Sequence, residues 1–250
     1  MGKIQYGFIP AAGKGSRLAN LPLIKILPKP MLPILNRPIV EYVVDRLKNN
    51  GIKEIYITIS NRGRVIKDYF QNGQKIGVKI HYLEEEPQGL AASIGLAEKV
   101  ISQPFFVILG DDFTVGDDSL ADLEKTFWQK RAWVVTAAVE EKNKESLKRT
   151  NCLVVDKSNR LIKAVEKPNH PVSNLRGCGI YLFHPNIFEF IKKTPISFRG
   201  QKEITDTIDL LAQQGRAYVS RLRGININVN TLEDLRAATN LLLNEQKLQR

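Results

Sequence analysis

Short apolar runs that suit β-strands alternate with stretches of helical periodicity in the first half of the chain, and this alternation constrains the fold most strongly. We predict strands over residues 4–9, 54–60, 78–83 and 105–109, a helix that starts at Pro38 and stops at Asn49-Asn50-Gly51, and a helix over residues 89–100. The run 105–109 is apolar throughout, as expected for a strand buried on both faces. Strands that alternate with helices form right-handed βαβ units and a mostly parallel sheet.

After residue 131 the pattern changes, because strand-like runs follow one another with less helix between them. We predict strands over residues 132–139, 153–156, 161–166 and 179–183, and helices over 203–214 and 232–248, the last packed across the outside. The predicted fold class is therefore α/β, a Rossmann-like three-layer α/β/α arrangement whose mixed, mostly parallel sheet carries added antiparallel strands. No internal repeat or Pro- and Gly-rich linker interrupts the chain, so we expect a single domain over residues 1–250.

A glycine-containing loop follows the first predicted strand, and ligands bind beyond the carboxyl ends of strands in open parallel sheets. Glycines let backbone N–H groups approach a phosphate chain. Neither phosphate motif is complete, because GxGxxG would need glycine where Leu18 stands and GxxxxGK[ST] is absent. Arg17, Lys25 and Lys29 follow in a proline-rich segment, and prolines stiffen a loop. By itself the loop fits a phosphate site and a structural turn equally well.

Two later strand ends also carry charged side chains. Asp111 and Asp112 follow the buried run 105–109, where a carboxylate beside a phosphate loop suits Mg²⁺. A capping or turn aspartate is the alternative. Glu166 and Lys167 end the predicted strand 161–166, and an acid followed by a base suits sugar hydroxyls and a phosphate. An exposed turn is the alternative there.

Taken in order, these segments resemble the sugar nucleotidyltransferase family, and in particular its UTP- and dTTP-using hexose-1-phosphate branch. The resemblance runs from about residue 4 to 238 and rests on six ordered motifs. They are Ile9-Pro10-Ala11-Ala12-Gly13-Lys14-Gly15-Ser16-Arg17-Leu18, Pro28-Lys29-Pro30-Met31-Leu32-Pro33-Ile34 with Arg37-Pro38-Ile39-Val40-Glu41-Tyr42, Pro87-Gln88-Gly89-Leu90-Ala91, Leu109-Gly110-Asp111-Asp112, Val165-Glu166-Lys167-Pro168, and Asn228-Val229-Asn230-Thr231-Leu232-Glu233-Asp234-Leu235.

The resemblance implies a role for each matching position. Arg17 and Lys29 are the implied catalytic cations, both neutralising charge on the triphosphate, and Glu166 and Lys167 are the implied ligands of the sugar phosphate. Asp111 and Asn228 are the implied Mg²⁺ ligands. The implied nucleotide-binding residues are Ala11, Ala12, Gly13, Gly15, Gln88 and Gly89. A nucleotide-diphospho-sugar transferase fold is also implied, with a nucleotide-binding half over about 1–130, a sugar-phosphate-binding half over about 131–230 and a C-terminal helix over about 231–250.

Some positions depart from the family pattern. Many relatives carry Asp where this chain has Asn228, and some N-acetylhexosamine uridylyltransferases carry Asn. Asn151-Cys152 stands where relatives often have a small glycine facing the sugar, and Glu84 stands about where a pyrimidine-reading Gln is often found. The chain stops after the final predicted helix without a hexapeptide-repeat segment, so we expect no acetyltransferase activity.

Charge and cysteine usage bound the partners. The net charge of +11 is dispersed along the chain and no nucleic-acid motif is present, so we expect no nucleic-acid partner. Cys152 and Cys178 lack CxxC spacing and suit a reducing compartment. The N-terminus lacks a signal-peptide h-region, and no apolar run is long enough to span a bilayer, which predicts a cytoplasmic protein without a membrane partner. Because relatives are often oligomers, a homo-oligomer is a further possibility.

The leading hypothesis is a Mg²⁺-dependent enzyme that transfers a nucleoside monophosphate from a nucleoside triphosphate, UTP or dTTP being favoured, to a sugar 1-phosphate, glucose 1-phosphate being favoured. A cytidylyltransferase for a non-sugar phosphate such as phosphocholine is one alternative. A nucleotide-sugar-binding regulator without catalysis is another.

Overall fold

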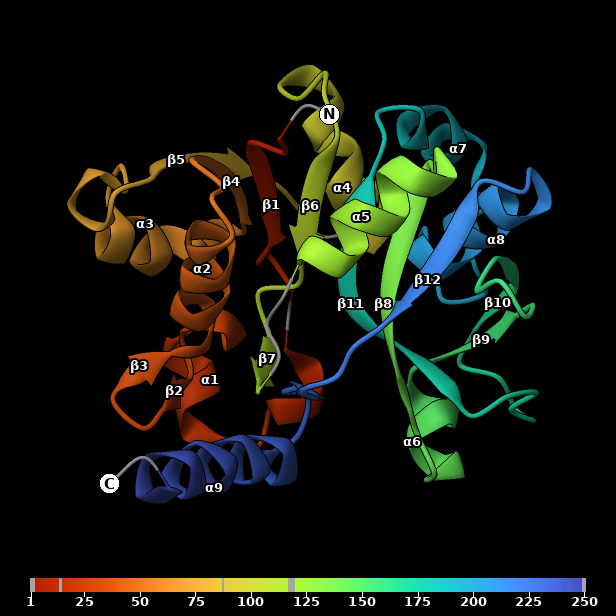
Figure 1. Cartoon of the computed structure of the whole chain (residues 1–250). Helices are drawn as coiled ribbons and strands as arrows, with labels where there is room; N and C mark the ends of the chain where they lie inside the picture. The colour runs from red at the N-terminus through yellow and green to blue at the C-terminus, as the bar shows by residue number, and fades with distance from the viewer. Residues whose placement is uncertain (1–2, 14, 87, 117–119, 249–250) are drawn as a thin grey trace.

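A seven-stranded sheet with helices on both faces forms the centre of the computed structural model, which describes residues 3–13, 15–86, 88–116 and 120–248 (Figure 1). The strand order is β12-β8-β11-β6-β1-β4-β5. The strands are β1 (Tyr6–Pro10), β4 (Glu54–Ile59), β5 (Lys79–Glu84), β6 (Phe105–Ile108), β8 (Val134–Glu140), β11 (Leu175–Phe183) and β12 (Ala217–Arg221).

The direction of the strands confirms the predicted mixed, mostly parallel sheet. β1 pairs in parallel with β4 and β6, β4 with β5, and β8 with β12, whereas β11 runs antiparallel to both β6 and β8. The chain moves from β1 outward to β4 and β5 and then returns to the other side of β1 as β6. Loops after β1 and β6 therefore diverge at the same edge, which is where open α/β sheets bind ligands.

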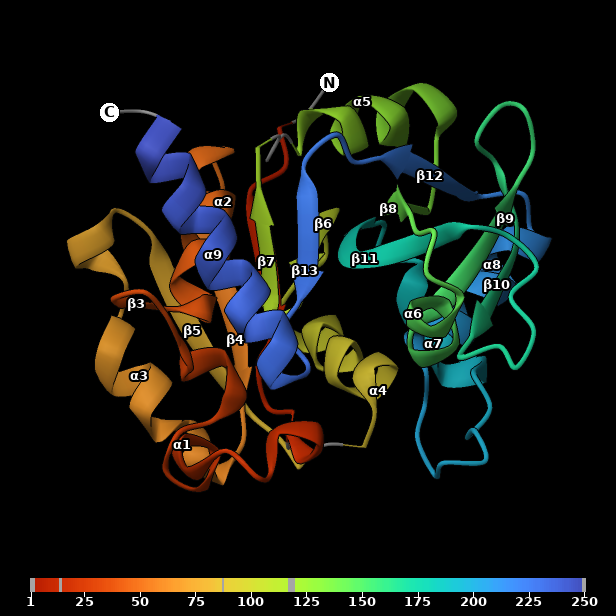
Figure 2. The ribbon, with the colours of Figure 1, turned by 90° about the horizontal axis from the view of Figure 1, so that it is seen from below.

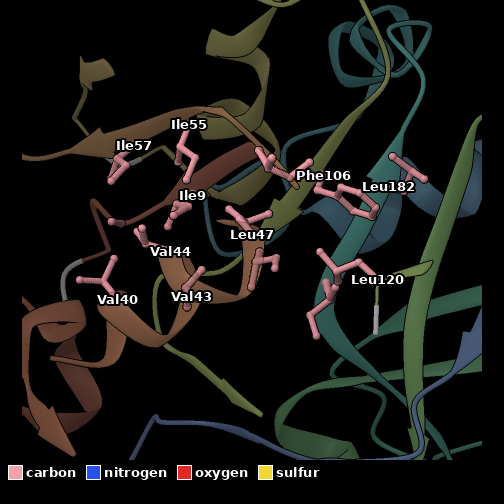
Figure 3. Close-up of a cluster of buried hydrophobic side chains, with 14 of the residues drawn as sticks. Ile9, Val40, Val43, Val44, Leu47, Ile55, Ile57, Phe106, Leu120 and Leu182 are labelled. Carbon is pink, nitrogen blue, oxygen red and sulfur yellow. The ribbon is translucent and has the colours of Figure 1, made fainter. Parts of the chain in front are cut away.

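The helices form two layers that bury opposite faces of the sheet. One layer contains α2 (Ile39–Asn49), α3 (Arg64–Phe70) and α5 (Ala121–Lys130). The other contains α4 (Leu90–Gly95), α7 (Ile187–Lys193) and α8 (Ile204–Gln213). In β6, Phe106 and Ile108 face the first layer, while Phe105 and Val107 face the second, and all four are buried. Figure 3 shows α2 side chains packed on the first face.

Among the described residues, three two-stranded sheets lie outside the seven-stranded sheet. β7 (Asp112–Val115) pairs antiparallel with β13 (Ile225–Asn228), β9 (Asn151–Val155) pairs with β10 (Leu161–Glu166), and β2 (Pro33–Ile34) with β3 (Arg37–Pro38). α1 (Pro22–Ile26) and α6 (Lys144–Arg149) complete this region. α9 (Leu232–Leu248) crosses the outside, as predicted, over α2 and the β7–β13 pair (Figure 2).

Several predicted boundaries need correction. The predicted helix over 89–100 is α4 followed by a 3₁₀ turn over Leu96–Lys99, and the first strand starts at Tyr6 rather than at residue 4. The α-helices and β-strands that the sequence pattern did not predict are α1, α3, α5, α6, α7, β2, β3, β7, β12 and β13. No helix among the described residues is both long enough and apolar enough to cross a membrane.

Gly7 in β1 tests how tightly the first helix layer packs on the sheet. A Cβ added at Gly7 would lie 2.8 Å from Leu47 Cδ1, on the inner face of α2. We expect Gly7→Ala to lower the free energy of unfolding by about 1–3 kcal/mol, as overpacked cores do. Urea denaturation measures this change. Gly95→Ala is the matched control, because its Cβ would meet Ile191 Cγ2 at 3.4 Å, an ordinary contact. An equal loss in both variants would contradict the tight packing of β1 on α2.

Candidate active site

Two cavities open at the edge where β1 and β6 end. The smaller, about 320 Å³, is lined by the loop after β1, by Lys29, Asp111, Glu85 and Ser93, and by Gly89 and Gln201. The larger, about 760 Å³, is lined by Arg17, Lys167, Arg176, Asn226, Asn228 and Asn230, with part of α6 and the start of α9. Lys29 Nζ in the smaller cavity donates to Asn230 Oδ1 in the larger at 2.9 Å, so the two cavities meet at this hydrogen bond.

Close backbone contacts bring the two loops together. Gly110 N donates to Pro10 O at 3.0 Å, and a Cβ on Gly110 would lie only 3.1 Å from both Ala11 Cβ and Pro10 O. Only glycine allows this approach without a shift of backbone. Asp111, the next residue, therefore lies beside the phosphate-type loop, as the sequence predicts for two strand ends at one edge.

The residues of the loop after β1 differ in what they contact. Ala11, Ala12, Gly13 and Gly15 all line the smaller cavity. The Ala11 amide already donates to Thr58 O and Oγ1 at 3.2 and 3.3 Å, which anchors the loop to β4. A Cβ on Gly13 would meet no atom of the described residues within 4 Å, so its exposed side leaves room for a ligand.

Gly15 packs closely against the side chain of Lys29. Its φ of 64° lies in the left-handed region, and a Cβ there would sit 3.3 Å from Lys29 Cβ. Lys29 Nζ forms an ion pair with Asp111, and both side chains are mostly buried. The implied catalytic Lys29 and the implied metal ligand Asp111 are thus in direct contact.

Arg17 lies apart from Lys29. It is exposed on the 3₁₀ turn Ser16–Leu18 and lines the larger cavity rather than the smaller. There it faces Lys167, whose pKa is lowered by burial and by the positive charges of Arg199 and Arg17. The resemblance places both cations on the triphosphate, whereas in the structure they line adjacent cavities.

Glu166 is held by two residues that the sequence analysis missed. Its Oε1 accepts from Arg199 Nη2 at 3.1 Å and its Oε2 from Thr205 Oγ1 at 2.7 Å. Burial raises the pKa of Glu166, although Thr205 and the neighbouring cations oppose the rise. Lys167, but not Glu166, lines the larger cavity. Arg199 lies between α7 and α8 and Thr205 in the first turn of α8, and neither belongs to a recognisable motif.

The motif over residues 87–91, which carries the implied nucleotide-binding residues Gln88 and Gly89, lies only partly in the smaller cavity. Gly89 lines it, whereas Gln88 is exposed and lines a neighbouring pocket with Ala12 and Glu85. A Cβ on Gly89 would lie 2.5 Å from Lys202 O, so the glycine permits a close approach of the 201–202 segment. Lys14 and Pro87 of the sequence motifs lie outside the described residues.

The structure shows what surrounds two positions that depart from the family pattern. Glu84 ends β5 and is exposed, whereas Glu85 lines the smaller cavity and accepts from Ser93 Oγ at 2.5 Å. Asn151 Oδ1 accepts from Gly177 N at 2.8 Å, and a Cβ on Gly177 would lie 2.9 Å from that oxygen. The side chain of Asn151 thus fills the space beside Gly177 on β11.

Asn228 and Asp111 offer oxygen ligands near the junction of the cavities. Val229 N donates to Asp111 O at 2.9 Å, which places Asn228 beside the Asp111 segment. Within the described ranges there is no group of three or more His, Cys, Asp or Glu side chains able to hold a metal ion. Mg²⁺ needs fewer protein ligands, since it binds one or two carboxylates, substrate phosphates and water. One carboxylate and one amide oxygen therefore fit Mg²⁺ that arrives with a phosphate substrate.

Three asparagines of β13 and the segment after it alternate with apolar residues. Asn226, Asn228 and Asn230 all line the larger cavity, and the period-2 pattern of residues 225–230 is the sequence signal for that shared face. Arg176 on β11 joins them and is buried.

The chain is similar in sequence to known nucleotidyltransferases. The family model described as nucleotidyl transferase matches residues 6–245. The chain is 35% identical over 238 residues to the bifunctional protein GlmU of Methanocaldococcus jannaschii, a match that covers 95% of this chain and 54% of the relative. It is 31% identical to a UTP–glucose-1-phosphate uridylyltransferase of Haloferax volcanii, with 96% and 94% covered.

The solved structures agree with the fold. A UDP-glucose pyrophosphorylase complexed with UDP-glucose superposes with a TM-score of 0.86 at 26% identity, over 97% of this chain and 99% of that chain. The chain spans about half the length of the GlmU relatives that it matches. With a family model matched over nearly all of its length and the fold of a sugar-nucleotide enzyme, this chain belongs to the nucleotidyl transferase family.

Proposed function

We propose that this protein transfers a nucleoside monophosphate from a nucleoside triphosphate to a sugar 1-phosphate and releases pyrophosphate. The observation that carries the proposal is the junction of the two cavities, where Lys29 contacts Asp111 on one side and Asn230 on the other. The smaller cavity suits the triphosphate and the larger suits the sugar phosphate. UTP or dTTP and glucose 1-phosphate are the favoured substrates, in line with the names of the relatives.

The reaction requires two anions to meet. An oxygen of the sugar phosphate attacks the α-phosphorus, a new P–O bond forms, and the bond to the leaving pyrophosphate breaks. Because the sugar phosphate is already ionised, no general base is needed. Lys29 on the triphosphate and Arg17 and Lys167 on the acceptor reduce the repulsion and hold both groups in place, which is the main source of catalysis in phosphoryl-type transfers.

Asp111 and Asn228 are the proposed protein ligands of Mg²⁺. When bound, the cation would neutralise the negative charge that develops on the phosphates during the transfer. Lys29 pairs with Asp111 and so holds the carboxylate in place beside the loop after β1. Glu166, fixed by Arg199 and Thr205, is the proposed acceptor for a sugar hydroxyl. Phosphocholine has no alcohol hydroxyl to donate and could offer that carboxylate only its quaternary ammonium charge.

Pyrophosphate release from the purified protein tests this function directly. We expect release that needs one nucleoside triphosphate, one sugar 1-phosphate and Mg²⁺ from a panel of the four ribonucleotides and dTTP against several sugar phosphates. Release with CTP and phosphocholine alone would instead identify a cytidylyltransferase. Nucleotide binding without release from any pair would identify a binding protein and remove the catalytic roles of Lys29 and Arg17.

Lys29→Ala separates catalysis from nucleotide binding. We expect kcat to fall by about 10²–10³-fold, because a fixed donor aimed at developing charge is lost, while nucleotide affinity changes much less. Steady-state kinetics and calorimetric titration measure the two effects. Lys25→Ala is the matched control, since Lys25 belongs to the same proline-rich segment and is exposed. Equal losses of affinity and kcat in Lys29→Ala would argue against a transition-state role.

Glu166→Gln tests recognition of the acceptor. A hydrogen bond to a charged group contributes about 1.5–3 kcal/mol, so we expect the KM for the sugar phosphate to rise about tenfold or more. The KM for the nucleotide should stay unchanged. Glu140→Gln is the control, because Glu140 is exposed and pairs with Arg221 at 3.1 Å. A rise confined to the nucleotide KM would place Glu166 in the other substrate's site.

A further inference from the structure

Asp112, the residue after the proposed metal ligand Asp111, is buried in a polar cluster beneath the junction of the cavities. Its exposed fraction is 2%. Oδ2 accepts from Asn226 Nδ2 at 2.6 Å, Oδ1 accepts from Thr114 Oγ1 at 2.9 Å, and Arg46 Nη1 lies 3.7 Å from Oδ1. Burial raises the pKa of Asp112 to about 6, although Arg46, Asn226 and Thr114 oppose the rise. Burying a carboxylate costs solvation free energy, so a buried aspartate at this position suggests a function beyond packing.

The side-chain amide of Asn228 lies between Asp112 and a buried arginine. Asp112 and Asn228 are direct partners in the β7–β13 pair. Asn228 Nδ2 donates to Asp112 Oδ2 at 3.5 Å, and Asn228 Oδ1 accepts from Arg176 Nη1 at 3.3 Å. An amide has one donor end and one acceptor end. A flipped amide would face its NH₂ group to the guanidinium and its oxygen to the carboxylate, so these two neighbours fix one orientation.

This contact also explains why residue 228 is an amide. An aspartate there would keep an acceptor for Arg176, but it would set an oxygen of a second carboxylate against Asp112 where Nδ2 now donates. The Asn228 oxygen has two lone pairs, and Arg176 uses one. The other remains for a cation near Asp111. Arg176 itself is steadied by Asn226, which bonds both Asp112 and Arg176.

We propose that Asp112 is a positioning residue that holds the Asn228 amide with its oxygen available to the divalent cation of the active site. The inference rests on the proposed function for the identity of that cation and its phosphate substrate. Loss of a partner that orients a metal ligand from behind typically costs about 10- to 100-fold in metal affinity or activity.

Asp112→Asn tests the proposal with Mn²⁺ as a spectroscopic substitute for Mg²⁺. Free Mn²⁺ is measured by electron paramagnetic resonance in titrations of the full chain with a non-hydrolysable UTP analogue, against the analogue alone. We expect the variant in complex with the analogue to bind Mn²⁺ about 10- to 100-fold more weakly than the wild type. Affinity for the analogue without metal should be unchanged. Asp156→Asn is the matched control, because Asp156 lies in a turn and bonds Ser158 and Arg160, away from both cavities.

Wild-type Mn²⁺ affinity in Asp112→Asn, with or without a lower melting temperature, would overturn the proposal and leave Asp112 a purely structural residue. An equal loss in Asp156→Asn would overturn it as well. If Asp112→Asn does not fold, Thr114→Val removes one donor to the same carboxylate, and we expect a smaller loss of Mn²⁺ affinity. Loss of Mn²⁺ affinity in a protein that releases no pyrophosphate from any substrate pair would support the role of Asp112 while rejecting the proposed function.

Discussion

The placement of β6 between β1 and β11 is the constraint on which the rest of the structure depends. Its residues Phe105–Ile108 are buried on both faces, parallel to β1 and antiparallel to β11. Burial of apolar side chains on two faces fixes the strand in the middle of the sheet. The chain that leaves β6 must therefore emerge beside the end of β1, and this puts Asp111 next to the glycine loop and Lys29.

The same strand joins the two halves of the chain. β11 comes from the second half and pairs with β6 on one side and β8 on the other. Arg176 on β11 thus reaches Asn226 and Asn228 on β13, and β13 pairs with β7, which directly follows β6 and Asp111. Residues more than a hundred positions apart meet at one edge because β1 from the first half and β11 from the second pair with β6 on its two sides.

Charges at this edge are arranged in pairs and networks rather than singly. Lys29 is matched by Asp111, Glu166 by Arg199 and Thr205, and Asp112 by Arg46 and Asn226. Buried charges persist only when partners compensate the loss of water. These partners hold the charged groups in and beside the cavities in fixed directions, and preorganised charge of this kind is a main source of transition-state stabilisation.

The sequence by itself determined most strands of the main sheet, the mixed character of that sheet and the position of the loops that carry Lys29 and Asp111, because strand and helix periodicity are local properties. Only the tertiary structure decided that Arg17 and Lys29 line different cavities, that Glu85 rather than Glu84 faces the smaller one, and that Asn228 lies between Asp112 and Arg176. Those facts depend on contacts between distant strands, and a side chain's partner across a sheet leaves no trace in its own neighbourhood of the chain.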